Sequence, residues 1–207
     1  MLNKFEDLND IQLDVLKEIG NIGSGNAANA LSSMIGKSIE IEMPSVKILG
    51  FQEAIEQNGS PEDVVGAVLI RLKGNIEGMV LLIIEEDFAE LVLETFFGAD
   101  PLNGKLLEFD EGRKSALAEV GNIMGSSYVN AISDLSQLKI DIELPSYTAD
   151  MLGAIMSVPV IEFGEVGDKL LCIDKKMRIN GVSVKSNMLL IPTVESLTTL
   201  FGKLGVQ

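Results

Sequence analysis

The chain contains the same segment twice, with the second copy starting 101 residues after the first. Residues 14–44 read DVLKEIGNIGSGNAANALSSMIGKSIEIEMP, and residues 115–145 read SALAEVGNIMGSSYVNAISDLSQLKIDIELP. The two copies align without a gap and keep a Glu, an Asn and a distant Pro in register. Self-similarity over such a period means that the chain is built from two equivalent units. The duplication therefore predicts two related halves, and it suggests two copies of one site.

Each copy reads as a long helix followed by a strand. Apolar residues at helical spacing predict helices over about residues 8–34, with Asn9 or Asp10 as a cap, and over about residues 110–135. Alternating β-branched segments predict strands at residues 37–51 and 139–146, and a Pro inside each implies an edge strand or a bulge. We expect further strands at residues 64–72, 76–84, 154–163, 169–177 and 182–191, and shorter helices at residues 86–97 and 194–204.

The linker ADPLNGKL, at residues 99–106, is the best boundary signal in the chain. It separates two repeats, about 5–98 and 106–205. Because burial becomes more efficient as a chain lengthens, the repeats are expected to share one core in a single domain, 1–207. The expected fold class is α+β, a tandem pseudo-two-fold duplication of a helix–strands–helix unit. Its sheet is expected to be mostly antiparallel, with the long helices packed on it.

Composition removes several kinds of chemistry. The chain has no His and a single Cys, Cys172, so it has no internal disulfide, and zinc sites of the usual Cys/His type are excluded. General-base catalysis by His is excluded too. Any metal held by this chain would need carboxylate ligands. We therefore expect neither a metal site nor a cofactor of its own.

Charge and hydropathy limit the partners. A net charge of −15 argues against binding to nucleic acid or to an anionic membrane surface. The first residues, MLNKFEDLND, do not resemble a signal peptide. The longest apolar region, residues 64–84, is interrupted by Arg71, Lys73 and Glu77, so no membrane insertion is expected. These features predict a cytoplasmic protein.

Three polar residues on each long helix share one face. They are Asp14, Glu18 and Asn21 in the first copy, and Ser115, Glu119 and Asn122 in the second. At about 100° per residue, each set falls within about 60° around the helix. We call them the first and second polar stripes. The core faces expected on the opposite sides are formed by Leu16, Ile19, Gly23 and Ala30, and by Leu117, Val120 and Met124.

The stripes have a plain alternative explanation. Any amphipathic helix carries polar residues on its outer face, and a duplicated unit inherits them. Exposed positions should nevertheless diverge after duplication, as Lys17 has done relative to Ala118. The Glu and the Asn of the stripes have not diverged. Their retention favours a shared function over an inherited surface.

The small residues after the first stripe, at 20–27 (GNIGSGNA), superficially resemble a glycine-rich phosphate loop. Such a loop follows a strand, whereas this segment continues a helix, and the second copy lacks the same glycines. Nucleotide binding is therefore disfavoured. The small residues instead indicate that the two long helices pack closely.

Both copies carry the pattern Asp/Ser-x-x-x-Glu-x-x-Asn, then twenty-two residues, then Pro. This pattern resembles the signature of the CheC family of chemotaxis phosphatases, which includes CheC, CheX and the related domain of FliY. The surrounding strings LKEIGNIGSGNAANALS and AEVGNIMGSSYVNAIS are also similar to that family, and the resemblance covers essentially the whole chain. Two motifs in one chain resemble two-site CheC more than CheX, which carries one motif per subunit.

The resemblance implies hydrolysis of the aspartyl phosphate of a phosphorylated CheY-type response regulator. By this resemblance, Asn21 and Asn122 orient the attacking water, and Glu18 and Glu119 contact the active-site lysine of the regulator. It also implies that the helix is laid against the phosphoaspartate site. Mg²⁺ is then expected on the regulator, not on this chain.

The resemblance implies lesser roles for other motif positions. Asp14 and Ser115 would help docking, and Pro44 and Pro145 would shape the strand behind each helix. The receptor deamidase CheD is an expected second partner. The alternative is a non-catalytic docking or flagellar-switch module of the same fold, which binds a response regulator or CheD.

Overall fold

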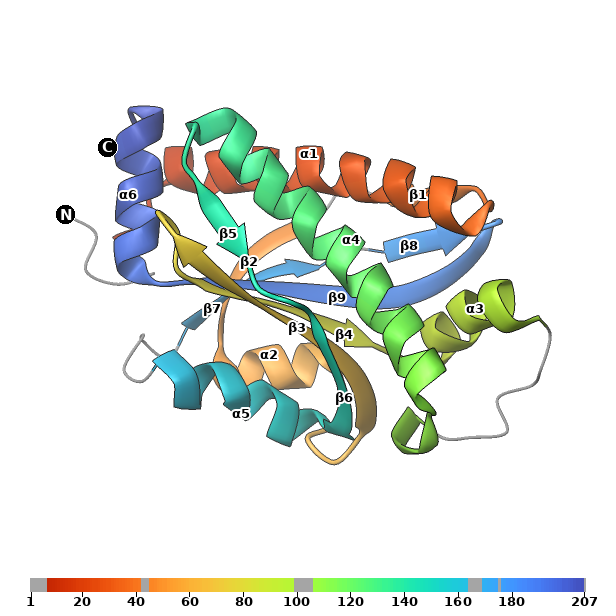
Figure 1. Ribbon diagram of the computed structural model, residues 1–207. Coiled ribbons are helices and arrows are strands. Elements are labelled where there is room, and N and C mark those ends of the chain that lie inside the picture. Colours follow the sequence, from red (N-terminus) through yellow and green to blue (C-terminus); the bar gives the residue numbers. More distant parts are fainter. Residues whose placement is uncertain (1–6, 42–44, 99–105, 164–168, 175, 207) are drawn as a thin grey trace.

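The structure is a computed structural model that describes residues 7–41, 45–98, 106–163, 169–174 and 176–206 (Figure 1). The first half contains α1 (Asp10–Ile35), β1 (Ile39–Ile41), β2 (Ser45–Gly50), α2 (Phe51–Asn58), β3 (Val64–Gly74), β4 (Gly78–Ile84) and α3 (Glu86–Phe97). The second half contains the 3₁₀-helix η2 (Leu106–Glu108), α4 (Glu111–Ser136), β5 (Ile140–Ile142), β6 (Ser146–Met151), α5 (Leu152–Phe163), β7 (Lys169–Asp174), β8 (Lys176–Ile179), β9 (Val182–Pro192) and α6 (Val194–Leu204).

The element bounds repeat along the chain. Each of α1, β1 and β2 has the same length as its counterpart among α4, β5 and β6, and each counterpart starts and ends 101 residues later. The helices α2 and α5 start 101 residues apart, whereas α3 and α6 start 108 residues apart. The expected fold class is therefore confirmed as a duplicated α+β unit. The repeat boundaries themselves stay a prediction.

The two halves exchange strands. At the centre of the sheet, β4 pairs antiparallel with β9, and Leu81 lies opposite Leu189. On one side, β3 pairs with β4 and also with β5 and β6 of the second half. On the other side, β7 and β8 both pair with β9. In addition, β7 pairs with β2 and β8 pairs with β1, both from the first half. The first two strands of each half thus complete the sheet of the other half, which makes the halves interdependent.

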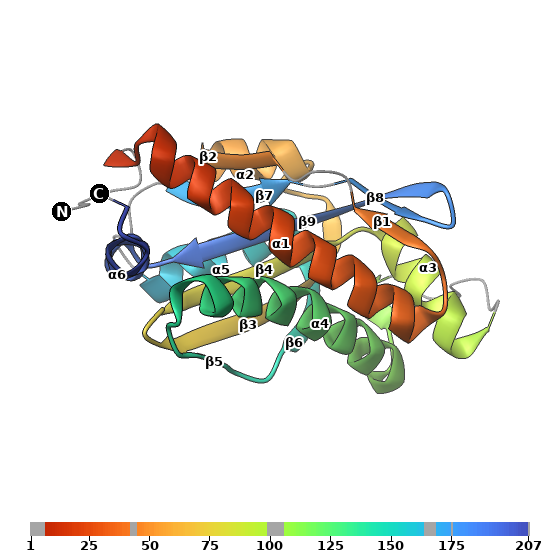
Figure 2. The same cartoon turned by 90° about the horizontal axis from the view of Figure 1, so that it is seen from above.

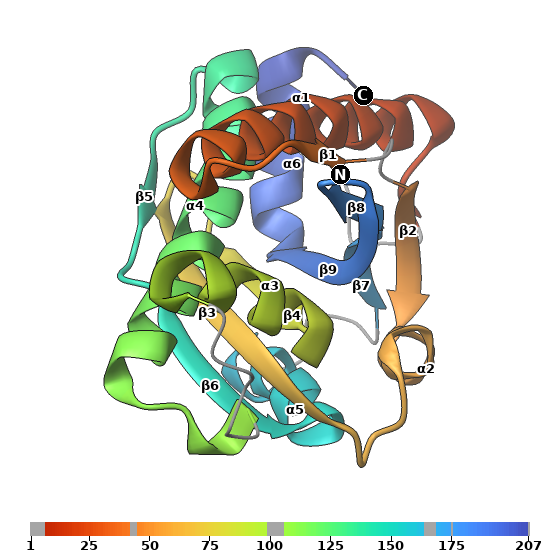
Figure 3. The ribbon, with the colours of Figure 1, turned by 90° about the vertical axis from the view of Figure 1, so that its right-hand side faces the viewer.

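Helices cover both faces of this sheet. One core contains buried residues of α1, α3, α4 and α6 with alternate sheet residues such as Val68, Ile70 and Leu82. The other contains buried residues of α2 and α5 with the intervening sheet residues, such as Leu69 and Leu81. Figures 1 and 3 show α1 and α4 on one side of the sheet and α2 and α5 on the other. Three layers result, and α1 and α4 lie in an outer one.

The two long helices begin and end in equivalent ways. At the start of α1, the Asn9 side chain accepts a hydrogen bond from the backbone N–H of Gln12, whose side chain in turn accepts from the Asn9 N–H. At the start of α4, Asp110 caps the helix through the Arg113 N–H at 2.9 Å. Both helices end in a left-handed residue, at Gly36 with φ 63° and at Gln137 with φ 58°. Four capped ends stabilise the helices that carry the stripes.

The helices α1 and α4 pack closely against each other (Figure 2). A Cβ at Gly23 would lie 2.6 Å from Cδ1 of the buried Tyr128 ring, so the ring occupies the space that a side chain would need. The hydroxyls of Tyr128 and Ser24 hydrogen-bond to each other inside this contact. Burial raises the pKa of Tyr128, so its hydroxyl stays protonated. The expectation that small residues allow close helix packing is confirmed at Gly23.

Several sequence expectations were wrong. Residues 154–163 were expected to form a strand but belong to α5, and α2 was not expected at all. The strand expected at 139–146 is divided into β5 and β6, and Pro145 lies in the irregular break between them. The strand expected at 37–51 is likewise divided into β1 and β2, and Pro44 lies outside the described residues. Because Pro145 is not inside a strand, the inference of an edge strand or a bulge does not apply to it; β2 and β6 nevertheless each pair with a single strand among the described residues.

The core face of α1 differs from expectation at one residue. Ala30 is exposed, whereas Ala27, Leu31 and Ile35 are buried. A spacing of four residues advances about 40° around the helix at each step, so the buried stripe drifts away from Ala30. The glycines do not interrupt α1, which is continuous from end to end. Among the described residues, no helix combines the length and the apolar character that a membrane span needs.

Candidate functional site

The structure places the two polar stripes on the outer surfaces of α1 and α4. Asp14 and Glu18 are exposed and Asn21 is half-buried; in the second copy Ser115 and Glu119 are exposed and Asn122 is half-buried. The apolar residues behind them are in the core, and they include Leu16, Ile19, Leu117, Val120 and Met124. The predicted outward direction of both stripes is therefore confirmed, except that each Asn is partly covered.

The graded exposure suits two different tasks. The carboxylates of Glu18 and Glu119 are open to solvent, so a basic group of another macromolecule can reach them. Asn21 and Asn122 are half-buried. An amide carries both a donor and an acceptor, so it can bind and orient a water molecule. Each stripe thus combines an exposed charge with a partly covered polar group.

Each stripe is self-contained on one helix. The polar contacts of stripe residues in the described part of the chain are a Lys17–Asp14 ion pair of 2.7 Å and a Ser126–Asn122 hydrogen bond of 3.4 Å. Neither contact joins the first stripe to the second. The two stripes therefore lie on separate helices, and their role as two sites stays a prediction.

The two stripes are not identical. In the first, Lys17 partly neutralises Asp14 through an exposed pair worth less than about 1 kcal/mol. In the second, Ser115 and Ala118 occupy these positions. Sequence reasoning singled out neither Lys17 as a partner of Asp14 nor Ser126 as a neighbour of Asn122. The spacing of three and four residues along a helix could have indicated both contacts.

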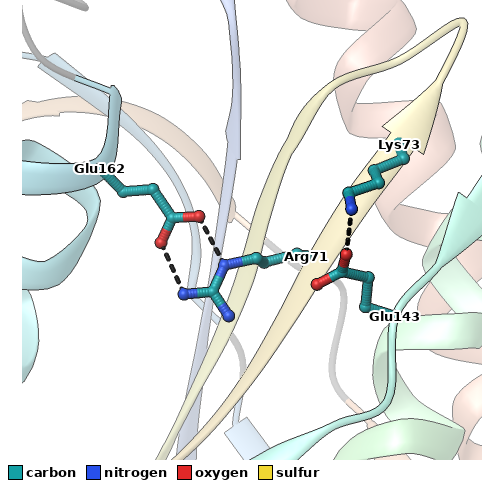
Figure 4. Close-up of polar contacts among 4 residues, drawn as sticks. All are labelled: Arg71, Lys73, Glu143 and Glu162. Carbon is teal, nitrogen blue, oxygen red and sulfur yellow. Dashed lines mark hydrogen bonds and ion pairs between the residues drawn. The ribbon is translucent and has the colours of Figure 1, made fainter.

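A second polar cluster is formed by Arg71, Lys73, Glu143 and Glu162 (Figure 4). Nε of Arg71 on β3 donates to Glu162 of α5 at 2.5 Å, and Nη2 donates to the other carboxylate oxygen at 2.8 Å. Lys73 on the same strand hydrogen-bonds Glu143, and this bond lowers the pKa of the Glu143 carboxyl. Each charge in the cluster has a partner of opposite sign. The cluster ties β3 to α5 and to the residues before β6, and it is structural.

The stripes offer carboxylates, amides and the hydroxyl of Ser115. In the described part of the chain, no group of three or more Cys, Asp and Glu side chains is placed to hold a metal ion. The side chains that are present can accept hydrogen bonds from a cation, and can orient a water molecule. The cation, and the group that the oriented water would attack, would both have to come from a second molecule.

Comparison with known proteins identifies the relatives of this chain. Residues 11–48 and 113–147, which contain both stripes, match the sequence model of the CheC-like family. The chain is 30% identical over 205 residues to the Bacillus subtilis CheY-P phosphatase CheC, and the match covers 98% of both proteins. It is also 30% identical over 140 residues to the Bacillus subtilis flagellar motor switch phosphatase FliY, a match to 68% of this chain and 36% of FliY.

A solved structure shows the same fold. The crystal structure of Thermotoga maritima FliY aligns with a TM-score of 0.71, over 96% of this chain and 98% of that one, at 22% identity. The duplicated sheet and the paired long helices are therefore a known architecture. Since the sequence match to the Bacillus subtilis phosphatase spans nearly the full length of both proteins, this chain belongs to the CheC-like family.

Proposed function

We propose that this protein hydrolyses the aspartyl phosphate of a phosphorylated CheY-type response regulator, at one site on α1 and one on α4. The observation that carries the proposal is the repeated arrangement of an exposed Glu and a half-buried Asn on the outer faces of both helices. The relatives, a CheY-P phosphatase and a flagellar motor switch phosphatase, support the same reaction.

The chemistry needs little from this chain. Transfer of a phosphoryl group to water passes through a loose transition state, so position and charge stabilisation matter more than removal of a proton from the water. Asn21 and Asn122 would each hold the water in line with the breaking O–P bond through their amides. No base is required, which fits a chain without His. The regulator would supply the phosphate, the Mg²⁺ and a lysine.

The Glu of each stripe has a binding role in this proposal. The exposed carboxylates of Glu18 and Glu119 would pair with the lysine ammonium of the regulator and so fix the docked orientation. Asp14 and Ser115, one turn before the Glu, would contact the regulator at the border of the site. Because the chain carries a net charge of −15, docking of the regulator requires local charge complementarity of this kind.

The test is the rate of phosphate loss from a phosphorylated CheY-type regulator, with and without this protein. We expect the wild-type protein to accelerate the loss above the rate of the regulator alone. Asn21→Ala and Asn122→Ala should each leave the other site active, because the sites lie on separate helices. No acceleration by the wild-type protein under conditions in which it binds the regulator would refute the proposal.

The Glu residues offer an independent test of the docking role. Glu18→Ala combined with Glu119→Ala should weaken activity mainly through a higher KM, because a contact with the partner is lost while the Asn amides remain. Glu18→Gln with Glu119→Gln keeps the shape and removes the charge, and should show the same change. An unchanged KM in both double variants would show that the carboxylates do not contact the regulator.

The second candidate is a non-catalytic docking or flagellar-switch module. The likeness to FliY, a flagellar motor switch phosphatase, favours the flagellar-switch part of this candidate but not the absence of catalysis. Such a module would bind the regulator without changing the rate of phosphate loss, so the assay above separates the two candidates. Binding of CheD is compatible with either function and does not discriminate between them.

A further inference from the structure

The two sites differ in what lies one turn after the Asn. In the second site the Ser126 hydroxyl donates a hydrogen bond to Oδ1 of Asn122 at 3.4 Å. The equivalent of Ser126 in the first site is Gly25, which has no side chain. A Cβ built at Gly25 would meet nothing within 4 Å. The Asn21 amide therefore has no hydroxyl neighbour at that position.

Ser126 differs from two other serines of this helix. Ser127 and Ser136 each donate to the backbone carbonyl four residues earlier, at 2.7 and 2.6 Å, which is the common pattern for serine inside a helix. Ser126 instead donates to the side chain four residues earlier. Its hydroxyl is directed at the amide that the proposed function places next to the reacting water.

We propose that Ser126 is a positioning residue, which holds the Asn122 amide in one orientation and makes the second site better organised than the first. This inference rests on the proposed function. The terminal torsion of an Asn side chain is broad and roughly two-fold, so a free amide exchanges its oxygen and nitrogen positions. A hydroxyl can either donate to Oδ1 or accept from Nδ2. The structure has the first arrangement, with Oδ1 toward Ser126. An amide kept in this arrangement presents one set of atoms to the water.

The expected effect is modest. A distance of 3.4 Å is longer than an ordinary O–H···O hydrogen bond, so the contact is weak. If an unrestrained amide spends about half of its time in the wrong orientation, the loss is about two-fold. Imperfect alignment of the water adds to this loss. We expect kcat to change about two- to five-fold, with little change in KM because the docking carboxylate is untouched.

The experiment isolates each site by removing the other. In an Asn21→Ala background, Ser126→Ala should lower kcat of the second site about two- to five-fold, and Ser126→Thr, which keeps a hydroxyl, should restore most of it. In an Asn122→Ala background, Gly25→Ser should raise kcat of the first site. Gly25→Ala is the matched control, because it adds a Cβ and helix propensity without a hydroxyl, and it should leave kcat unchanged.

A second readout does not depend on activity. In the free protein, the side-chain amide of Asn122 should have a higher NMR order parameter than that of Asn21, and Ser126→Ala should remove the difference. Equal order parameters in the wild-type protein, or an unchanged kcat in Ser126→Ala, would overturn the positioning role. If Asn21→Ala/Asn122→Ala keeps full phosphatase activity, the proposed function itself fails. The amide order parameters do not depend on activity, so they show separately whether the positioning of Asn122 by Ser126 fails.

Discussion

Replacing Gly23 with Ala inserts a methyl group into the contact between α1 and α4. The new Cβ would lie 2.6 and 2.7 Å from Cδ1 and Cγ of Tyr128, and 3.0 Å from its Cα. Carbon atoms in contact prefer about 3.5–4.0 Å, so the helices would have to separate by about 1 Å. Tyr128 is fully buried, and its hydroxyl is bonded to Ser24, so the ring has no free space to enter. Overpacking of this kind costs about 1–3 kcal/mol.

The same substitution two residues later provides the control. Gly25→Ala meets nothing within 4 Å, so it should gain the helix propensity of Ala over Gly, up to about 1 kcal/mol, without any clash. Gly23→Ala gains the same propensity, so the difference between the two variants measures the overpacking alone. For a protein of this size, 1 kcal/mol shifts Tm by about 2–4 °C. We therefore expect Gly23→Ala to melt on the order of 5 °C below Gly25→Ala.

Urea denaturation followed by far-UV circular dichroism gives the free energies of unfolding of both variants. Equal m-values would establish that the comparison is one of stability alone. If Gly23→Ala proves as stable as Gly25→Ala, then Tyr128 does not occupy the space above Gly23, and the close packing of the two helices described above is wrong.

Three further measurements of stability test the fold and the claim that the stripe residues contribute little to the free energy of unfolding. Asn21→Ala and Asn122→Ala should each change the free energy of unfolding by less than about 0.5 kcal/mol, since neither amide is in the core; a larger loss would indicate a structural role. Gln137→Gly should stabilise the protein by about 0.5–1 kcal/mol, because φ is 58° and the equivalent residue of the first copy is a Gly; a loss of stability would show that the Gln side chain matters more than the backbone. Fragments 1–98 and 106–207 should each lack a cooperative unfolding transition alone and regain one when mixed, because the first two strands of each half pair with the other half; cooperative unfolding of a lone fragment would contradict the strand exchange.

The long helices and the stripes could be predicted because two signals agreed. Helical spacing of apolar residues placed Leu16 and Leu117 in the core, and the offset between the copies placed the Glu and Asn of both stripes on one outer face. The structure has both helices with the same length and the same 101-residue offset. Where the periodicity of the sequence and its internal repeat point to one answer, the prediction held.

The helix α5 was missed because its sequence offers no periodicity. Residues 154–163 read AIMSVPVIEF, an almost continuous apolar run with a Pro, and such a run does not distinguish a buried helix from a strand. The internal repeat contained the missing signal. Its first-copy equivalent starts FQEAIEQN at residue 51, in which buried Ala54 and Ile55 follow helical spacing among polar residues. Alignment of the two copies beyond Pro44 would have predicted both helices.

The exchange of strands between halves was beyond sequence reasoning for a different reason. Pairing partners are set by contacts between residues far apart, such as Ile39 of β1 with Ile179 of β8, and local pattern does not encode them. The partial burial of Asn21 and Asn122 is likewise a property of packing. Helical geometry alone gives the direction of a side chain and leaves open how far its neighbours cover it.

The most direct test of the central claim compares two pairs of Asn residues on the same two helices. Asn29 and Asn130 are related by the same offset as Asn21 and Asn122 and are also retained and exposed. They lie eight residues further along α1 and α4, about 80° away around each helix, so they test whether position on the stripe matters beyond retention. The measurement is the rate of phosphate loss from a phosphorylated CheY-type regulator in the presence of each double Ala variant. We expect Asn29→Ala/Asn130→Ala to accelerate phosphate loss as much as the wild-type protein does. In Asn21→Ala/Asn122→Ala the acceleration should fall on the order of 10²-fold or more. Equal rates for the two double variants would contradict a catalytic role for the stripes.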